Sequence, residues 1–308
     1  MQVARSSKRP RAGALLTLAI VLGGSSPASA FVRTRSATTQ APFFHRSPQA
    51  ILEVAVPPDT LQISADDVRA AAQAAVDTWS YPAIACTSLS LTLAPGLVDS
   101  QVVAYDGHNR IVMRTGSWCR DPDTLTNCHD DNQVALTTVF SRNHPGALDD
   151  GQILEADIEI NDVDYQWAII PDGPISGRDY EYLYDLTSAL THETGHFVGL
   201  AHVCELPGDP VRVDNHGDPS PDCTDVTTVD AEQLNESTMY PTMGPGDVSL
   251  RTLTDDDMAA ACSVYPTTVP TVVGSCQVAP TGPARGVLAA LGASLALMLI
   301  AVRRTRRR

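Results

Sequence analysis

The sequence predicts an α+β fold with a twisted mixed sheet, followed by a C-terminal transmembrane helix. Three observations carry this prediction. An alanine-rich helical pattern comes first, alternating apolar runs typical of strands follow it, and a second apolar helical pattern lies downstream of them. Because helices and strands are not in strict alternation, we expect helices packed against a sheet that borders a cleft.

The first 30 residues have the three parts of a secretory signal peptide. Basic residues precede an apolar core from Gly13 to Leu22, and Ala28-Ser29-Ala30 is a small-residue cleavage site. The core is short for a membrane anchor, so cleavage after Ala30 is favoured over an uncleaved anchor. The protein is therefore expected to be exported, with residues 31–49 as a short N-terminal segment.

Residues 50–265 are expected to form the folded domain. A first long helix is predicted from Ser64 to Ser80, because Ser64 can cap it and an acidic first turn leads into an alanine-rich body. Asp185 can cap the second helix. Alternation predicts four strands: 87–93, 109–115 (Ile111 and Met113 on one face), 134–140, and 153–161 (Ile158 and Ile160 inward).

The second helical pattern contains the most informative residues of the chain, His192-Glu193-x-x-His196-x-x-Gly199-x-x-His202. Residues four apart share one face of a helix, so His192 and His196 can point at one ion. Gly199 can end the helix in a left-handed conformation, and His202 then returns as the third ligand. Three ligands leave one zinc position for water, as a hydrolytic site requires. An apolar core helix with chance histidines is the alternative, which the completeness of the motif disfavours.

This motif resembles that of the metzincin clan of zinc endopeptidases. Ser237 to Pro241 resembles the clan's Met-turn, in the Met-Tyr-Pro form typical of matrixins. Residues 68–79, 156–161 and 253–258 resemble the first helix, a central strand and the start of the last helix of matrixin-like catalytic domains. Two features depart from matrixins: Val203 stands where they usually have Ser, and Met239 follows His202 at a distance of 37 positions, longer than in compact matrixins.

The resemblance implies a metzincin-like zincin domain that cleaves protein or peptide substrates. We expect the protein to be a monomer. His192, His196 and His202 would bind one catalytic Zn²⁺. Glu193 would act as the general base on the zinc-bound water. The active-site helix would thus carry the general base and two of the three zinc ligands.

The same resemblance assigns roles around the metal. Met239 would pack beneath the ligands, while Tyr240 and Pro241 would shape the pocket just beyond the cut bond. Metzincins bind the substrate backbone along an exposed edge strand, and 134–140 is the candidate from its order in the chain. An ordinary buried strand at 134–140 is the alternative.

Two other functions stay open. One is a non-catalytic surface adhesin or binding module on a metalloprotease scaffold, and the other is a zinc hydrolase that acts on non-peptide bonds. The intact Glu193 argues against the first, since the stability of a scaffold does not need that carboxylate.

Seven cysteines in an exported chain indicate disulfides. Six lie within 50–265 and allow fifteen pairings. Short loops favour Cys119–Cys128 and Cys204–Cys223, which leaves Cys86 with Cys262. Cys276 is then the odd thiol.

Further metal sites are weaker predictions. The Asp-rich insert 204–236 is either a calcium-stabilised loop or a disulfide-pinned surface loop, and the second is preferred. Matrixins often hold a second, structural zinc, for which His129, Asp131 and His144 are candidates. Their spacing matches poorly, so surface-loop histidines are favoured.

The C-terminal end predicts attachment to a membrane. Residues 266–285 form a Pro/Thr-rich linker with Cys276, 286–302 form an apolar span near the lower length limit, and 303–308 are an Arg-rich cytoplasmic tail. Together they resemble the sorting tails of myxobacterial surface proteins, which implies processing and retention at the cell surface. A plain single-span anchor is the alternative.

The charge of the chain disfavours nucleic-acid partners. Its formal net charge is −15, and Lys8 is its only lysine. Phosphate contacts need clustered Lys and Arg, which the region between the two ends lacks. The acidity suits Ca²⁺ binding or, equally, a solvated acidic surface.

Overall fold

The computed structural model describes residues 30–55, 63–121, 124–172, 180–224 and 231–267. Within these ranges, no helix is both long and apolar enough to span a bilayer. The predicted signal core, transmembrane helix, Arg-rich tail and Cys276 lie outside the described residues, as does the predicted linker from residue 268 onward.

The described chain has the predicted α+β class. A mixed, mainly parallel sheet contains β1 (Phe44–His45), β2 (Gln49–Ala55), β3 (Ser90–Val98), β4 (Asn109–Arg114), β7 (Ala135–Ser141) and β8 (Gln152–Asn161). Two small ribbons pair β5 (Cys119–Asp121) with β6 (Thr126–Cys128), and β9 (Trp167–Ala168) with β10 (Tyr184–Asp185). The helices are α1 (Ala65–Thr78), α2 (Leu186–Phe197), α3 (Ala231–Glu236), the 3₁₀ turn η1 (Ser249–Arg251) and α4 (Asp255–Val264).

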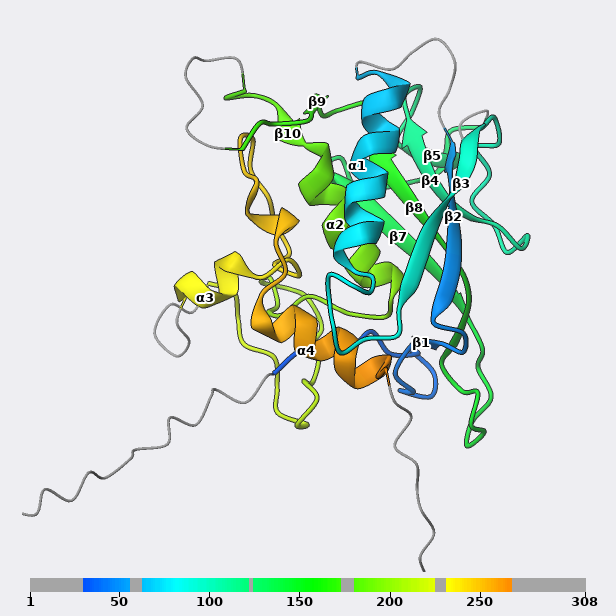
Figure 1. Ribbon diagram of the computed structural model, residues 1–308, viewed down its shortest axis with the longest axis vertical. Coiled ribbons are helices and arrows are strands. Elements are labelled where there is room, and N and C mark those ends of the chain that lie inside the picture. Colours follow the sequence, from blue (N-terminus) through cyan, green and yellow to red (C-terminus); the bar gives the residue numbers. More distant parts are fainter. Residues whose placement is uncertain (1–29, 56–62, 122–123, 173–179, 225–230, 268–308) are drawn as a thin grey trace, which may run out of the picture. The chain divides into compact units, whose positions relative to one another are not determined.

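The order of the strands places β7 at an edge of the sheet. The path runs β1-β8-β4-β2-β3 with parallel neighbours, and β7 pairs antiparallel with β8. No other described strand pairs with β7. Helices α1 and α2 lie next to each other over one face of this sheet (Figure 1).

The main core lies between that face and the two helices. Ile111 and Met113 of β4, and Ile158 and Ile160 of β8, are buried in it, as their alternation predicted. Helix α1 contributes a buried stripe at helical spacing: Val68, Ala71, Ala72, Ala75 and Val76. Burial of this continuous apolar layer fixes α2 against the sheet.

The helix starts agree with their predicted caps. The Ser64 side chain accepts a hydrogen bond from Asp67 N at 3.1 Å, and the Asp185 side chain accepts one from Ser188 N at 2.7 Å. Asp185 is fully buried, and the Arg251 guanidinium pairs with its carboxylate. This ion pair compensates the buried charge of the residue that caps α2.

The strands agree less closely with their predictions. The predicted strands 109–115, 134–140 and 153–161 match β4, β7 and β8 within one residue at each end. The strand predicted at 87–93 begins three residues later and extends to Val98. Strand β2 was not predicted. Its Leu52 is fully buried while its neighbour Ile51 is 61% exposed, so two adjacent apolar residues hide the alternation.

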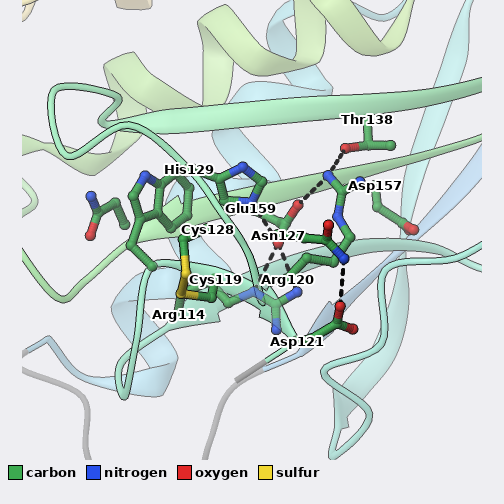
Figure 2. A network of polar contacts seen from close by, with 12 residues as sticks. Arg114, Cys119, Arg120, Asp121, Asn127, Cys128, His129, Thr138, Asp157 and Glu159 are labelled. Carbon is green, nitrogen blue, oxygen red and sulfur yellow. Dashed lines mark hydrogen bonds and ion pairs between the residues drawn. A yellow bond between two sulfur atoms is a disulfide. The ribbon is translucent and has the colours of Figure 1, made fainter. Parts of the chain in front are cut away.

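The other face of β8 carries buried carboxylates that contact β4, the residues just before it and β5. Glu155 accepts hydrogen bonds from the backbone of Asp106 and Gly107, and Asp157 accepts one from Arg110 N at 2.8 Å. Burial raises the pKa of Asp157 to about 7. Glu159 pairs with Arg114 at 2.7 Å and with Arg120 at 3.1 Å (Figure 2). The contacts of Asp106, Gly107 and Arg120 hold the residues before β4 and strand β5 on this face.

The cysteines pair as predicted. The structure joins Cys86 to Cys262, Cys119 to Cys128 and Cys204 to Cys223. The first disulfide joins the segment just before β3 to α4, and its two cysteines are 176 positions apart in the sequence. The second closes the β5–β6 ribbon, and the third closes a loop of the insert between Cys204 and Cys223.

Candidate metal centre and active site

Three histidines converge at the C-terminal end of α2. The ring centroids of His192 and His196 lie 4.8 Å apart, those of His196 and His202 4.8 Å, and those of His192 and His202 5.3 Å. One ligand atom from each residue lies within 4.8 Å of the other two. Among the described residues, this is the group of His, Cys, Asp and Glu side chains that could hold a metal ion.

Helix geometry and one glycine produce this convergence. His192 and His196 lie one turn apart on α2. The chain then reverses at Gly199, whose φ of +95° is the left-handed conformation that favours glycine. A Cβ atom at this position would lie 2.7 Å from Phe43 O. The reversal brings His202 back, so its Nε2 lies 3.2 Å from Nε2 of His196.

The N-terminal segment supports the reversed chain. Thr34 N donates to Gly199 O, and Ala201 N donates to Val32 O, both at 3.0 Å. Phe31 is buried in the main core. Residues 31–49 therefore pack on the domain whose start was predicted at residue 50, and they hold the turn that carries His202.

The hydrogen bonds that His192 and His196 make through Nδ1 direct the Nε2 lone pairs of both rings at the space between the three histidines. His192 Nδ1 lies 2.7 Å from Thr238 O, and His196 Nδ1 lies 2.9 Å from Leu200 O. A carbonyl oxygen only accepts, so each Nδ1 carries the hydrogen and each Nε2 keeps its lone pair.

Burial keeps these imidazoles neutral. It lowers the pKa of His192 to about 4 and of His196 to about 3, and it lowers the pKa of His202 as well. Neutral imidazole is the form that binds metals. Ligand nitrogens about 2.0–2.1 Å from a tetrahedral zinc lie roughly 3.3 Å apart. The 3.2 Å between Nε2 of His196 and Nε2 of His202 matches that spacing, and the ligand atoms of all three residues lie within 4.8 Å of one another.

Glu193 lies in the same cavity as the three histidines. It is 5% exposed, and burial raises the pKa of its carboxyl to about 7. The hydroxyl of Thr137, on β7, donates to its Oε2 at 2.6 Å. A buried carboxyl with a raised pKa next to a cluster of metal-ligand type is a common feature of catalytic sites.

Met239 lies beneath α2 and is 1% exposed. It packs against Gly195, where a Cβ atom would overlap the Met239 Sδ and lie 3.0 Å from Trp79 Cζ2. The Trp79 ring is itself fixed, because its Nε1 donates to Thr191 O at 2.8 Å. Gly195 thus allows the Met239 turn to approach the helix that carries two of the histidines.

Buried Asp257 of α4 holds that turn in place. Its carboxylate accepts from Thr238 N at 3.0 Å and from Ser237 Oγ at 3.1 Å. Val203 N donates to Met239 O at 3.1 Å, and the Val203 side chain is buried in the core. The backbone of Val203, the residue after His202, therefore connects the turn to the third histidine, and this hydrogen bond does not involve the Val203 side chain.

Replacing Gly195 by Ala is expected to destabilise the protein by about 1–3 kcal/mol, because the added methyl overpacks Met239 against Trp79. Without that overlap, Ala in a helix would be more stable than Gly. Equilibrium unfolding in guanidinium chloride measures the change. Gly116→Ala is the matched control, since a Cβ atom there meets nothing within 4 Å. Equal or greater stability of Gly195→Ala would contradict this account of the packing.

The histidines open onto a cavity of about 780 Å³. Its walls come from β7 and the residues before it, from Tyr240 to Met243 after the Met239 turn, and from the insert. Tyr240 and Pro241 line it, as does the insert's Arg212, which pairs with Glu205. A larger cavity of about 880 Å³ lies near His45 and His108 and contains none of the three clustered histidines.

The remaining candidate ligands do not come together. His129 packs on Trp118 and lies 3.6 Å from Glu159, while His144 lies near Asp149. Neither joins Asp131 in a metal-binding group within the described chain. In the insert, Asp214 accepts hydrogen bonds from the backbone of His216 and Asp218, and Cys204–Cys223 closes the loop.

Sequence reasoning missed Thr137, the Thr238 carbonyl and Asp257. Each acts through a tertiary contact with α2 or the Met239 turn. A local pattern marks only Asp257, which forms a capping box with Thr254, and that pattern does not reveal its contact with the turn. The chain matches no protein-family model, and no curated protein is significantly similar to it.

Proposed function

We propose that this protein is an exported, zinc-dependent endopeptidase with a metzincin-like catalytic domain. One observation carries the proposal: three neutral imidazoles meet around one point, and a buried glutamate lies beside them in an open cavity. His192, His196 and His202 would hold the ion. A zinc ion there would supply Lewis-acid polarisation of the scissile carbonyl and make water acidic enough to react near neutral pH.

The chain's own residues supply the proton transfers and the positioning. Glu193 would accept the proton of the attacking water on its free carboxylate oxygen and would pass it to the leaving amine. Its raised pKa, about 7, lies near the value that suits a group that both accepts and donates a proton.

The edge strand and the wall of the cavity suit a peptide. Strand β7 has one unpaired edge in the described fold, and its residues 135–137 line the cavity with Glu193. An extended substrate would add to this edge through backbone hydrogen bonds. Tyr240 and Pro241 would contact the side chain that follows the cut bond.

Export of the protein is part of the same proposal. Three disulfides are typical of an oxidising compartment outside the cytoplasm. The C-terminal tail would then anchor the enzyme at the cell surface, or be processed there.

A protein-cleavage assay with and without a chelator tests the proposal. The purified protein should cleave unfolded casein, lose this activity in 1,10-phenanthroline, and regain it when Zn²⁺ is added back. A non-catalytic adhesin would show no cleavage at all. A zinc hydrolase for other bonds would bind zinc and leave casein intact, and either result would reject the endopeptidase.

A further inference from the structure

We propose that Thr137 is a positioning residue for Glu193, and that through it the strand that receives the substrate also orients the general base. This inference rests on the proposed function and adds a residue to it. Thr137 lies in the middle of β7, whereas Glu193 lies on α2, 56 residues later in the chain.

The alternation of β7 directs Thr137 toward the site. Ala135 and Val139, two residues to either side, pack against the main core that includes α2. Thr138 points to the opposite face, where its hydroxyl accepts a hydrogen bond from Arg120 at 2.7 Å (Figure 2). Arg120 also binds Glu159 on that face. Neighbouring threonines of one strand therefore make polar contacts on opposite faces of the sheet, and one of them reaches the general base.

The hydroxyl of Thr137 has one hydrogen and two acceptors within reach on Glu193. The carboxylate Oε2 lies at 2.6 Å and the backbone carbonyl oxygen at 3.1 Å. The shorter distance is typical of a charge-assisted hydrogen bond to a carboxylate. It is the hydrogen bond that this carboxylate makes within the described residues, so Oε2 is occupied and Oε1 is left free for the water.

Orientation of a buried base affects turnover more than substrate binding. Without the hydroxyl, the Glu193 carboxylate would lack this hydrogen bond and could rotate about its last torsion. A base that is misplaced by a fraction of an ångström loses rate in the chemical step. We therefore expect Thr137→Val, which keeps the shape and removes the hydroxyl, to lower kcat by about 10–100-fold and to change KM less than twofold. Thr137→Ser keeps the hydroxyl and should restore most of kcat.

A double-mutant cycle tests the contact without any metal or activity. The full chain, disulfides intact and zinc removed by chelation, is unfolded in guanidinium chloride with Thr137→Val, Glu193→Ala and both changes. Thr137→Val should raise the unfolding equilibrium constant about tenfold in the wild-type background. In the Glu193→Ala background, Thr137→Val should raise the unfolding equilibrium constant by a clearly smaller factor, because only the backbone carbonyl of residue 193 remains there as an acceptor.

Thr138→Val is the matched control. It is the same chemical change on the opposite face of the same strand, so its effect on unfolding should be equal in both backgrounds, and cleavage of casein should stay within twofold of wild type. Equal effects of Thr137→Val in both backgrounds would overturn the proposal, as would an unchanged kcat or a failure of Thr137→Ser to restore it. If the wild-type protein cleaves no peptide, the endopeptidase itself is rejected, and the cycle still reports whether the two side chains are coupled.

Discussion

Replacing Glu193 by Ala is expected to lower kcat/KM for peptide cleavage by about 10²–10⁴-fold while the protein still binds one zinc ion. General bases contribute rate factors of this size. Glu193 is not among the three proposed metal ligands, and its carboxylate instead accepts a hydrogen bond from Thr137. The loss should therefore appear in catalysis alone, measured as initial rates on a fluorogenic peptide, with zinc content determined by atomic absorption.

Two further variants make this result specific. Glu193→Gln keeps the size and the hydrogen bond from Thr137 but cannot take a proton, so it should be nearly as inactive as Glu193→Ala. Glu181→Ala removes an exposed glutamate and should leave both activity and zinc content unchanged. If Glu193→Ala retains cleavage near the wild-type rate, the general-base role is wrong even if zinc is bound.

Replacing His202 by Ala is expected to remove both zinc and activity. Loss of a residue that merely supports a metal ligand costs about 10–100-fold in affinity, so loss of a ligand should cost at least about 100-fold. His202 is the proposed ligand that lies outside α2, and without it two histidines one helix turn apart would remain. Zinc affinity is measured by competition with a chromogenic chelator.

Thermal unfolding gives an independent reading of the same variant. Zinc that binds only the folded state should raise the melting temperature of the wild-type protein and leave that of His202→Ala almost unchanged. His108→Ala is the control, because His108 is exposed and pairs with Glu53 away from the cluster. Stoichiometric zinc in His202→Ala, with wild-type affinity and cleavage, would show that His202 is no ligand.

Helix positions were predictable because their signals are local. Ser64 and Asp185 precede helical patterns that they cap, and the structure shows both caps with the expected hydrogen bonds. Strand β2 was missed for the opposite reason. Its exposed Ile51 is apolar like its buried neighbours, and only its pairing with β3 and β4 makes this segment a strand.

The site divides in the same way. The spacing of the three histidines, with Gly199 between the second and third, is enough to predict that they meet, because helix periodicity and a left-handed turn are local geometry. The partners that set the Nδ1 hydrogens were not predictable. Thr238 O lies 46 residues from His192, and only the fold brings that carbonyl to the ring.

The sequence by itself determined that three histidines meet with a glutamate beside them, the caps of the two main helices and the disulfide pairs that short loops favour. The tertiary structure decided which face of β7 meets α2, that Thr137 holds the Glu193 carboxylate, and that Gly195 accommodates Met239. The physical reason is range. Helical spacing and caps act over a few neighbouring residues, whereas these contacts depend on how helices and sheet pack, which is decided by burial of the whole apolar core.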